Sequence, residues 1–202
     1  MSSTSHWEAV YRGRATEDLG WYEPRPSTLD LVLRFSDPAD AVIDIGAGDS
    51  RLPVELLAVG YERITVLDLS ETALERARSR LGSAAARLEW IRADVTRWTP
   101  PRRWDVWHDR AVFHFLIDEE DQQAYKAAAL QTVPVGGKLI VATFAPDGPE
   151  QCAGLPVERY DADELAAVFA PEFRLVEHQH LPNNKTDVGD TRPYIAVVLE
   201  RA

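Results

Sequence analysis

Residues 41–48, Ala-Val-Ile-Asp-Ile-Gly-Ala-Gly, decide the fold of this chain. An apolar run that ends in two closely spaced glycines and leads into a helix-like segment is typical of a buried parallel strand, a tight turn and a helix N-terminus. Glycine suits such a turn because a residue without Cβ can bend the backbone sharply and let a ligand approach it. The stretch therefore predicts the first strand of a ligand-binding α/β unit.

A second apolar run, residues 64–68, ends in Asp68, which follows Gly48 by 20 positions. In nucleoside-binding βαβ units a carboxylate about 20 residues after the glycines accepts hydrogen bonds from the ribose. The pair of features predicts a nucleoside cofactor, although it does not say which one.

The remaining sequence predicts five strands that alternate with helices. The strands are expected at residues 41–45, 64–68, 88–93, 104–108 and 138–144, and the helices near residues 26–34, 50–60, 70–81, 118–132 and 161–169. Alternation of this kind predicts a parallel sheet with helices on both faces. Two more β-rich runs, 173–181 and 194–200, have no helix between them, so we expect them to pair as an antiparallel hairpin. The fold is thus predicted to be a doubly wound α/β fold with a mostly parallel seven-stranded sheet and a C-terminal antiparallel hairpin.

The start of each helix is marked by a capping residue. Asp49 or Ser50 is expected to cap the second of these helices, Ser70 the third and Asp118 the fourth. Ser5-His6-Trp7-Glu8 has the spacing of a capping box, which predicts a further short helix near the N-terminus.

The length of 202 residues suits one domain. We expect residues 1–36 to form an N-terminal helical and aromatic lid and residues 37–202 to form the core. The lid aromatics are Trp7, Tyr11, Trp21 and Tyr22, and a tryptophan face also suits a cation. Ordinary core packing is the competing interpretation of these four side chains.

Composition restricts the partners and the location. The formal net charge of −11 argues against a nucleic-acid substrate, because phosphate binding relies on Lys and Arg. Neither a signal peptide nor a membrane span is expected, since no apolar run approaches the ~18 residues that a span requires. A single cysteine, Cys152, is typical of a reducing compartment, so we predict a cytoplasmic protein.

The residues at the strand ends indicate which nucleoside is bound. In the dinucleotide fingerprint a small residue follows the second glycine by three positions, and here Arg51 occupies that position, which disfavours NAD and FAD. Asp44 is a carboxylate inside an apolar strand, so we expect it to face the cofactor. Asp94 is expected to accept from an exocyclic adenine amine, with the Val95 backbone reading the ring. Each of these assignments has a structural alternative. The glycines could form only a structural turn, Asp68 could belong only to a helix-cap region, and Asp94 could be only a loop cap.

Three segments, Asp44-Ile45-Gly46-Ala47-Gly48, Leu67-Asp68-Leu69-Ser70 and Ala93-Asp94-Val95, together resemble the class I S-adenosylmethionine-dependent methyltransferases. The resemblance covers about residues 40–145 and implies a Rossmann-like sheet. It implies that Gly46 and Gly48 border the methionine part, that Asp44 lies near its amino group, that Asp68 holds the ribose and that Asp94 holds the adenine. The predicted cofactor is S-adenosylmethionine, with S-adenosylhomocysteine as product, and the predicted cofactor-binding residues are Trp21, Asp44, Gly46, Gly48, Asp68, Leu69, Asp94 and Val95.

Residues 104–110, Trp-Asp-Val-Trp-His-Asp-Arg, resemble the Trp-Asp-Arg segment of thiopurine-type small-molecule methyltransferases, with His108 inserted. The glycine motif does not follow that group. Residues 21–24, Trp-Tyr-Glu-Pro, resemble uncharacterised bacterial methyltransferases and some protein-lysine enzymes. The two local likenesses point to different acceptors.

Methyl transfer needs a base only when the nucleophile must lose a proton. We predict Asp109 and His108 as the catalytic pair because they follow the fourth predicted strand. Substrate contacts are predicted for Tyr22, Arg110, His114 and Phe144. Arg110 would hold a substrate carboxylate, or else pair with a surface acid, and His114 would face the substrate or else the core. No metal site is predicted, since His178 and His180 lack a nearby acid or thiol ligand.

The sequence therefore predicts an S-adenosylmethionine-dependent methyltransferase that acts on a small-molecule acceptor. The alternatives are a protein-lysine N-methyltransferase and a non-catalytic cofactor-binding module. An NAD-linked oxidoreductase is disfavoured by Arg51 and by the absence of a Tyr-x-x-x-Lys pair after the later strands. The sequence predicts neither the acceptor atom nor the oligomeric state.

Overall fold

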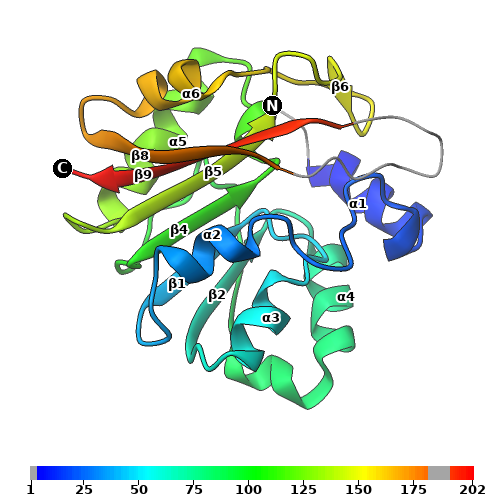
Figure 1. The fold of residues 1–202 in the computed structure, drawn as a ribbon. Coiled ribbons are helices and arrows are strands. Elements are labelled where there is room, and N and C mark those ends of the chain that lie inside the picture. The colour runs from blue at the N-terminus through cyan, green and yellow to red at the C-terminus, as the bar shows by residue number, and fades with distance from the viewer. Residues whose placement is uncertain (1–3, 182–191) are drawn as a thin grey trace.

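The computed structural model describes residues 4–181 and 192–202, and a twisted seven-stranded sheet runs through its centre (Figure 1). The order of the strands is β3-β2-β1-β4-β5-β9-β8. Their bounds are Ala41–Ile45 (β1), Arg63–Asp68 (β2), Glu89–Arg92 (β3), Val106–Arg110 (β4), Lys138–Phe144 (β5), Phe173–Leu181 (β8) and Tyr194–Arg201 (β9).

Strands β1 to β5 pair in parallel, whereas β9 pairs antiparallel with both β5 and β8. The C-terminal hairpin therefore places β9 inside the sheet and leaves β8 at its edge. This arrangement confirms the predicted doubly wound α/β fold and the predicted antiparallel hairpin. The predicted polar loop of the hairpin falls largely on residues 182–191, which lie outside the described part of the chain.

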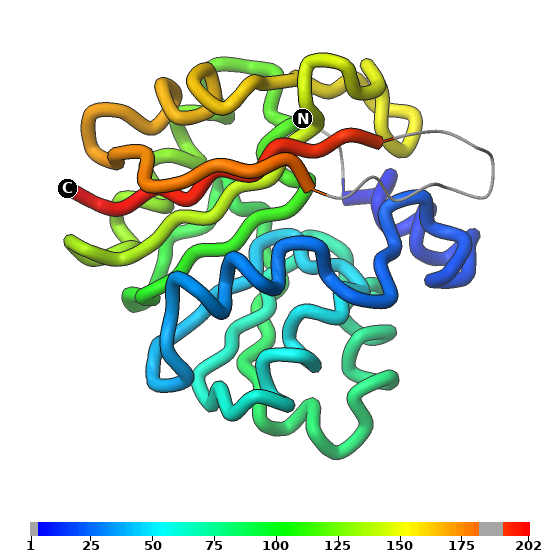
Figure 2. The backbone as a smooth tube through the Cα atoms, viewed as in Figure 1, coloured from blue at the N-terminus to red at the C-terminus, as the bar shows by residue number. Residues whose placement is uncertain are grey.

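Helices cover both faces of the sheet, as Figures 1 and 2 show. Leu29–Arg34 (α2), Leu52–Ala58 (α3) and Glu71–Leu81 (α4) pack on one face, and Glu119–Thr132 (α5) and Ala162–Phe169 (α6) pack on the other. Every residue of β1 is buried, as expected for a central strand that is covered on both sides. Short 3₁₀ turns occur at Thr16–Asp18 (η1), Gly82–Arg87 (η2) and Phe113–Phe115 (η3).

Helices α2 and α3 begin later in the chain than predicted, whereas α4 begins at its predicted cap. Ser70 caps α4 as predicted, since its Oγ accepts from the backbone N–H of Ala73 at 3.2 Å. Helix α3 begins later than expected, with Arg51 and not Asp49 or Ser50 at the N-cap position. Asp49 is unavailable as a cap because its carboxylate binds Thr16 and Arg80. Helix α2 likewise begins at Leu29, after a turn at Pro26.

The fourth strand lies two residues further along the chain than the predicted 104–108. Trp104 precedes β4 as a fully buried side chain whose Nε1 donates to Thr65 Oγ1 at 2.8 Å. His108 and Asp109 therefore lie within the strand, and Arg110 ends it. A second small sheet of Gln151–Cys152 (β6) and Leu155–Pro156 (β7) was not predicted, because its strands are only two residues long.

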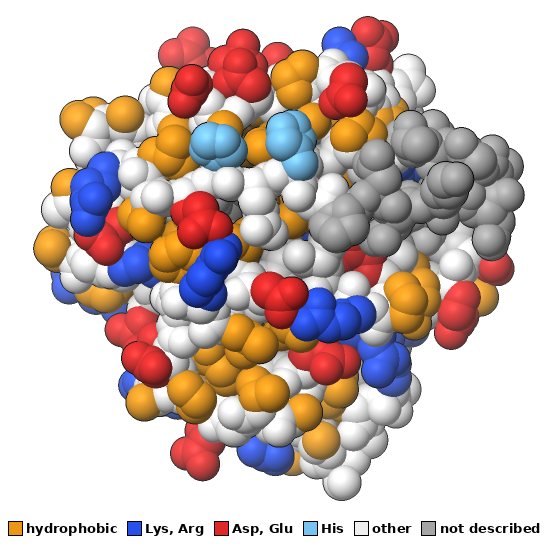
Figure 3. All heavy atoms as spheres, viewed as in Figure 1, with side chains coloured by type: hydrophobic (Ala, Val, Ile, Leu, Met, Phe, Trp, Pro, Cys, Tyr) orange, Lys and Arg blue, Asp and Glu red, His pale blue; other side chains and the backbone are white. Residues whose placement is uncertain are grey.

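Charged side chains of both signs are interspersed over the face shown in Figure 3. Among residues 4–181 and 192–202, no helix is both long enough and apolar enough to span a bilayer. The same residues contain no group of three or more His, Cys, Asp and Glu side chains placed to hold a metal ion.

Candidate active site

A cavity of about 820 Å³, including its open mouth, lies at the carboxyl ends of β1, β2 and β4. Ligands of doubly wound sheets bind in this position. The cavity is lined by Trp7, Tyr11, Trp21, Ile45, Gly46, Leu67, Asp68, Leu69, Ala93, Asp94, Val95, Arg110, Ala111, Val112, Phe115, Leu116 and Cys152. The structure thus brings together six of the eight predicted cofactor residues, and the other two, Asp44 and Gly48, adjoin the same cavity through Gly46 and Asp68.

The turn after β1 needs both of its glycines. Gly46 and Gly48 have φ angles of +57° and +55°, a conformation that costs other L-residues about 1–2 kcal/mol. A Cβ on Gly46 would lie 2.0 Å from Cγ2 of Val112, and a Cβ on Gly48 would lie 2.1 Å from the hydroxyl of Tyr11. Two cavity-lining side chains therefore occupy the space that the glycines leave open.

Asp68 ends β2 and faces the cavity. One carboxylate oxygen accepts from the N–H of Gly48 at 2.7 Å, and the other accepts from the N–H of Ser70 at 2.7 Å. Burial raises the pKa of Asp68 to about 6, the two backbone hydrogen bonds oppose this rise, and nearby Asp44 adds to it. Each oxygen keeps a further lone pair, which is what a pair of ribose hydroxyls requires.

Leu69, Asp94 and Val95 form the far wall of the cavity. Asp94 Oδ1 accepts from both the backbone N–H and the hydroxyl of Thr96, at 3.0 and 2.8 Å. The Asp94 Oδ2 atom lies 4.0 Å from Nε of exposed Arg97. Asp94 therefore shapes its own loop with one oxygen while its side chain still lines the cavity.

The roof of the cavity is aromatic and comes from the N-terminal segment, residues 4–28. The ring of Trp7 meets those of Trp21 and Phe115 edge to face, with centroids 5.9 and 5.1 Å apart. Tyr11 packs against Trp21 at 6.3 Å. These rings lie where the sequence placed the lid, and Tyr22 faces the adjoining cavity instead.

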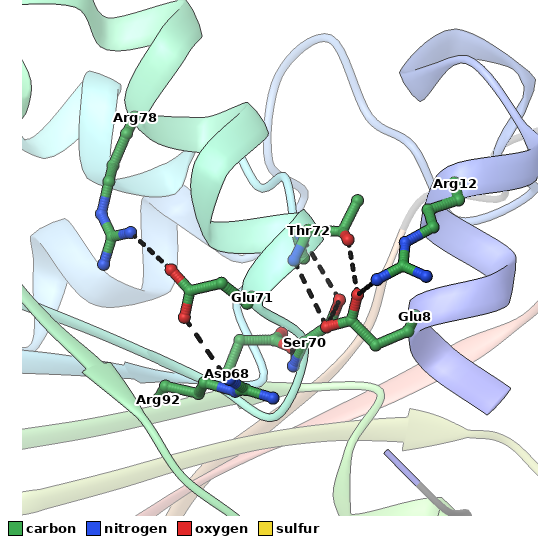
Figure 4. A network of polar contacts seen from close by, with 9 residues as sticks. Glu8, Arg12, Asp68, Ser70, Glu71, Thr72, Arg78 and Arg92 are labelled. Atoms are coloured by element: carbon green, nitrogen blue, oxygen red, sulfur yellow. Dashed lines mark hydrogen bonds and ion pairs between the residues drawn. The ribbon is translucent and has the colours of Figure 1, made fainter. Parts of the chain in front are cut away.

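Helix Thr4–Gly13 (α1) is attached to the N-terminus of α4 through Glu8 (Figure 4). The Glu8 carboxylate accepts from the hydroxyls of Thr72 and Ser70 at 2.5 and 3.1 Å. The hydrogen bond from Thr72 makes the largest contribution to lowering the pKa of Glu8. A carboxylate at a helix N-terminus also interacts favourably with the helix dipole.

Asp44 and His108 form a buried chain on the opposite side of Gly46. They are register partners on β1 and β4, so both side chains leave the same face of the sheet. Asp44 Oδ1 lies 2.7 Å from His108 Nδ1, and His108 Nε2 lies 2.8 Å from Thr28 Oγ1. Both residues line a second cavity, which shares Tyr11, Trp21, Gly46 and Arg110 with the first. His108 is thus engaged on both ring nitrogens.

Asp109 leaves the other face of β4 and does not line either cavity. Its carboxylate accepts from the N–H groups of Val112 and Phe113 at 2.8 and 3.1 Å and from the hydroxyl of Tyr125 at 2.6 Å. Burial raises the pKa of Asp109 to about 6. The prediction that Asp109 acts on the acceptor assumed that it follows β4, whereas the structure places it inside the strand, supporting the η3 turn.

Arg110 is the residue that ends β4, and it lines both cavities. Its guanidinium donates to the carbonyl of Trp21 at 3.1 Å and to Glu23 at 2.8 Å. Glu23 is 8% exposed, so the acid that pairs with Arg110 is a buried one, not a surface one.

His114 and Phe144 lie behind the cavity wall. Both are fully buried, with ring centroids 4.8 Å apart, and neither lines the two cavities. Burial and the neighbouring charge of Arg110 lower the pKa of His114 to about 3. The sequence did not indicate Val112, Phe115, Leu116 or Cys152 as lining residues, because short apolar turns carry no motif.

Comparison with known proteins identifies the family. Residues 42–137 match the model described as "Methyltransferase domain". A trans-aconitate 2-methyltransferase of Sinorhizobium fredii is 31% identical over 172 residues, which cover 84% of this chain and 63% of that protein. Residues 42–137 therefore form a methyltransferase domain of the class I S-adenosylmethionine-dependent type. The predicted family and its predicted cofactor are thereby confirmed.

Two further likenesses extend over nearly the whole methyltransferase chain. The eEF1A lysine and N-terminal methyltransferase of Mus musculus is 23% identical over 194 residues, which cover 96% of this chain but only 27% of that protein. The solved structure of the 1,6-didemethyltoxoflavin-N1-methyltransferase of Burkholderia thailandensis, with bound 1,6-didemethyltoxoflavin and S-adenosylhomocysteine, is 21% identical and has a TM-score of 0.71. The alignment covers 99% of this chain and 84% of the Burkholderia chain. The likeness shows that the two chains share a fold.

The residues present fit S-adenosylmethionine. Among the described residues, Asp44 Oδ2 is buried and has no hydrogen-bond partner, so it is able to accept from an ammonium group. Asp68 has lone pairs left for the ribose hydroxyls.

The raised pKa of Asp68 predicts that cofactor affinity depends on pH. Ribose hydroxyls donate to the ionised carboxylate, whereas the free protein protonates Asp68 below about pH 6. Binding below this pH must release the proton, so we expect the Kd for S-adenosylhomocysteine to rise about tenfold between pH 7 and pH 5. Calorimetric titration at a series of pH values measures this slope. The Asp68→Asn variant should bind more weakly and without the slope, and an unchanged slope would assign the titration to another group.

Proposed function

We propose that this chain transfers the sulfonium methyl group of S-adenosylmethionine to a small-molecule acceptor held beneath the N-terminal segment. The observation that carries the proposal is the aromatic roof formed by Trp7, Tyr11 and Trp21 over the cavity. A cavity closed in this way suits a molecule that can be enclosed whole. The small-molecule acceptors named for the Sinorhizobium and Burkholderia proteins agree with it.

The side chains of the cavity would act mainly by placing the reactants. When bound, S-adenosylmethionine supplies a methyl group on a sulfonium, which is already an activated electrophile. Asp44 would hold the amino group, Asp68 the ribose and Asp94 the adenine amine. Trp7, Trp21 and Phe115 would exclude water and orient the acceptor, and such alignment lowers the barrier without an acid or a base. Trp21 would also offer its ring face to the sulfonium.

A protein-lysine acceptor is the second candidate. It is favoured by the alignment of 96% of this chain with a mouse enzyme named for lysine and N-terminal methylation. Because the chain spans only 27% of that protein, the likeness is confined to one part of it.

Calorimetry and a transfer assay test the proposal. We expect S-adenosylhomocysteine to bind and NAD not to bind, and the opposite result would refute the proposed cofactor site. Methyl transfer is then followed with a labelled donor against small thiols, amines and carboxylic acids, and separately against a protein lysate. A labelled small product supports the proposal, whereas label in a protein band alone supports the lysine alternative.

A further inference from the structure

Next to Arg110 and Cys152, which line the cavity, lies a group of buried and half-buried polar side chains to which the cofactor site assigns no role. Arg110 ends β4, His114 belongs to η3, Cys152 belongs to β6 and Tyr194 begins β9. The guanidinium carbon of Arg110 lies 4.7 Å from the centre of the Tyr194 ring, which in turn stacks on His114 at 6.4 Å. Arg192 adjoins the group, since its guanidinium lies against Gly20, next to the Trp21 carbonyl that accepts from Arg110.

This group contains an unusual number of unsatisfied polar atoms. Among the described residues, no hydrogen-bond partner is present for Arg110 Nε, Arg192 Nε and Nη1, the Tyr194 hydroxyl or either ring nitrogen of His114. Buried polar atoms in folded proteins are nearly always paired, because an unpaired one keeps the full cost of its desolvation. Four neighbouring side chains have polar atoms of this kind, which indicates that a bound group supplies their hydrogen-bond partners.

The chemistry of the unpaired atoms defines that partner. The arginine nitrogens are donors only, the tyrosine hydroxyl can donate, and a neutral imidazole offers one N–H beside one acceptor nitrogen, so donors predominate. A matching group must therefore present several acceptor oxygens close together, as a carboxylate does.

The charges point the same way. Among the described residues, the charged side chains that belong to the group or act on it are Arg110, Arg192 and Glu23, and Glu23 already accepts from Arg110 at 2.8 Å. His114 is neutral, because burial and Arg110 lower its pKa to about 3. Cys152 is neutral as well, because burial raises its pKa to about 11. Among the described residues the group therefore contains two half-buried guanidinium groups and one carboxylate, although the chain as a whole carries a net charge of −11.

We propose that Arg110, Arg192, His114 and Tyr194 form an acceptor-binding subsite for a carboxylate, so that the methyl acceptor is a small organic acid. The inference rests on the proposed function, since it places the carboxylate of the acceptor beside the wall of the same cavity. Arg110 and Cys152 connect the subsite to the cavity. The Gly20–Glu23 stretch lies over it, because Gly20 contacts the Arg192 guanidinium and the Trp21 carbonyl accepts from Arg110.

Matched pairs of acids and amides test the subsite. Benzoate with benzamide and glutarate with glutaramide are titrated in chloride-free buffer into the protein, with and without saturating S-adenosylhomocysteine. We expect at least one acid to bind about tenfold or more tightly than its amide, because only the acid offers a negative charge and purely accepting oxygens. Equal binding of acid and amide in both pairs would overturn the proposal.

Variants separate this subsite from the cofactor site. Arg192→Gln should remove the preference for the acid and leave the Kd for S-adenosylhomocysteine unchanged, Arg192→Lys should keep part of the preference, and exposed Arg103→Gln should change neither. An acid preference that survives Arg192→Gln would overturn the assignment. If the unaltered protein does not bind S-adenosylhomocysteine, the proposed function is contradicted. The subsite is still tested separately in that case, because the acid–amide comparison is also made without S-adenosylhomocysteine.

Tyr194→Phe gives a second readout that a merely structural tyrosine would not give. Its hydroxyl is buried without a partner among the described residues, so its removal should leave the Tm unchanged or higher while weakening acid binding. A lower Tm with unchanged acid binding would show that the hydroxyl serves the fold.

Discussion

Replacing Gly48 by alanine is expected to raise the Kd for S-adenosylhomocysteine by about 10- to 100-fold. The new Cβ would lie 2.1 Å from the Tyr11 hydroxyl and 3.1 Å from its Cζ, so the tyrosine must move. Tyr11 is 5% exposed and packs in the roof of the cavity, so its displacement deforms the space that the cofactor would occupy. Overpacking of a dense region costs about 1–3 kcal/mol, and each 1.4 kcal/mol lost from binding is a factor of ten.

Gly82→Ala is the matched control for this variant. Gly82 has a φ of +57°, nearly that of Gly48, but among the described residues nothing lies within 4 Å of the position that its Cβ would take. Both variants should lose stability to backbone strain, Gly82→Ala the more because the ψ of Gly82 is −130°, outside the left-handed helical region, and only Gly48→Ala should lose affinity. Adding Tyr11→Phe should recover part of that affinity, because it removes the atom nearest to the new methyl group. Equal cofactor affinity in Gly48→Ala and Gly82→Ala would mean that the contact with Tyr11 is unimportant.

The cofactor side of the site was predictable because its information is local. The glycines and Asp68 follow apolar strands of clear period, and the carboxyl ends of parallel strands meet at one edge of a sheet. It was possible to predict strands β1, β2 and β5 and the cap at Ser70 without knowing which distant residues contact them. The aromatic N-terminal segment was expected near that edge because it precedes the first strand.

The rest depends on contacts between residues far apart in the sequence. The hydrogen bond of Asp44 with His108 spans 64 positions, and the ion pair of Glu23 with Arg110 spans 87. Nothing near Arg110 in the sequence shows that its partner precedes the first strand. The donors without partners around Tyr194 become visible only when β9 is placed beside β5, where Tyr194 and Phe144 are register partners.

A shift of two residues in β4 explains why the predicted catalytic pair separates. If the strand ended at His108, both His108 and Asp109 would face the cavity from a loop. Because β4 continues to Arg110, successive side chains leave opposite faces of the sheet. His108 therefore binds Asp44 on one face, and Asp109 binds the η3 turn on the other. The structure supports a positioning role for Asp109 in place of a direct one.

Replacing Asp109 by alanine is accordingly expected to destabilise the protein by about 3–5 kcal/mol. The substitution leaves the N–H groups of Val112 and Phe113 and the hydroxyl of Tyr125 without their acceptor in a fully buried place. Each such group costs about 1–3 kcal/mol when it is left unsatisfied, and solvent cannot reach this site without a rearrangement. Urea unfolding at pH 7 measures the loss, and exposed Asp147→Ala should show almost none.

The pH dependence of stability distinguishes this account from a catalytic one. The folded-state pKa of Asp109 is raised to about 6, so the folded protein binds the proton more tightly than the unfolded chain. The corresponding stability is fully present below the ordinary carboxyl pKa near 4 and is lost as the pH rises to about 6. Asp109→Asn, which carries no titrating proton, should lack this part of the pH dependence, so its deficit relative to the unaltered protein should grow as the pH falls from 7 to 4.5. A catalytic Asp109 would give the contrary pattern: unchanged urea midpoints at every pH, together with lost methyl transfer.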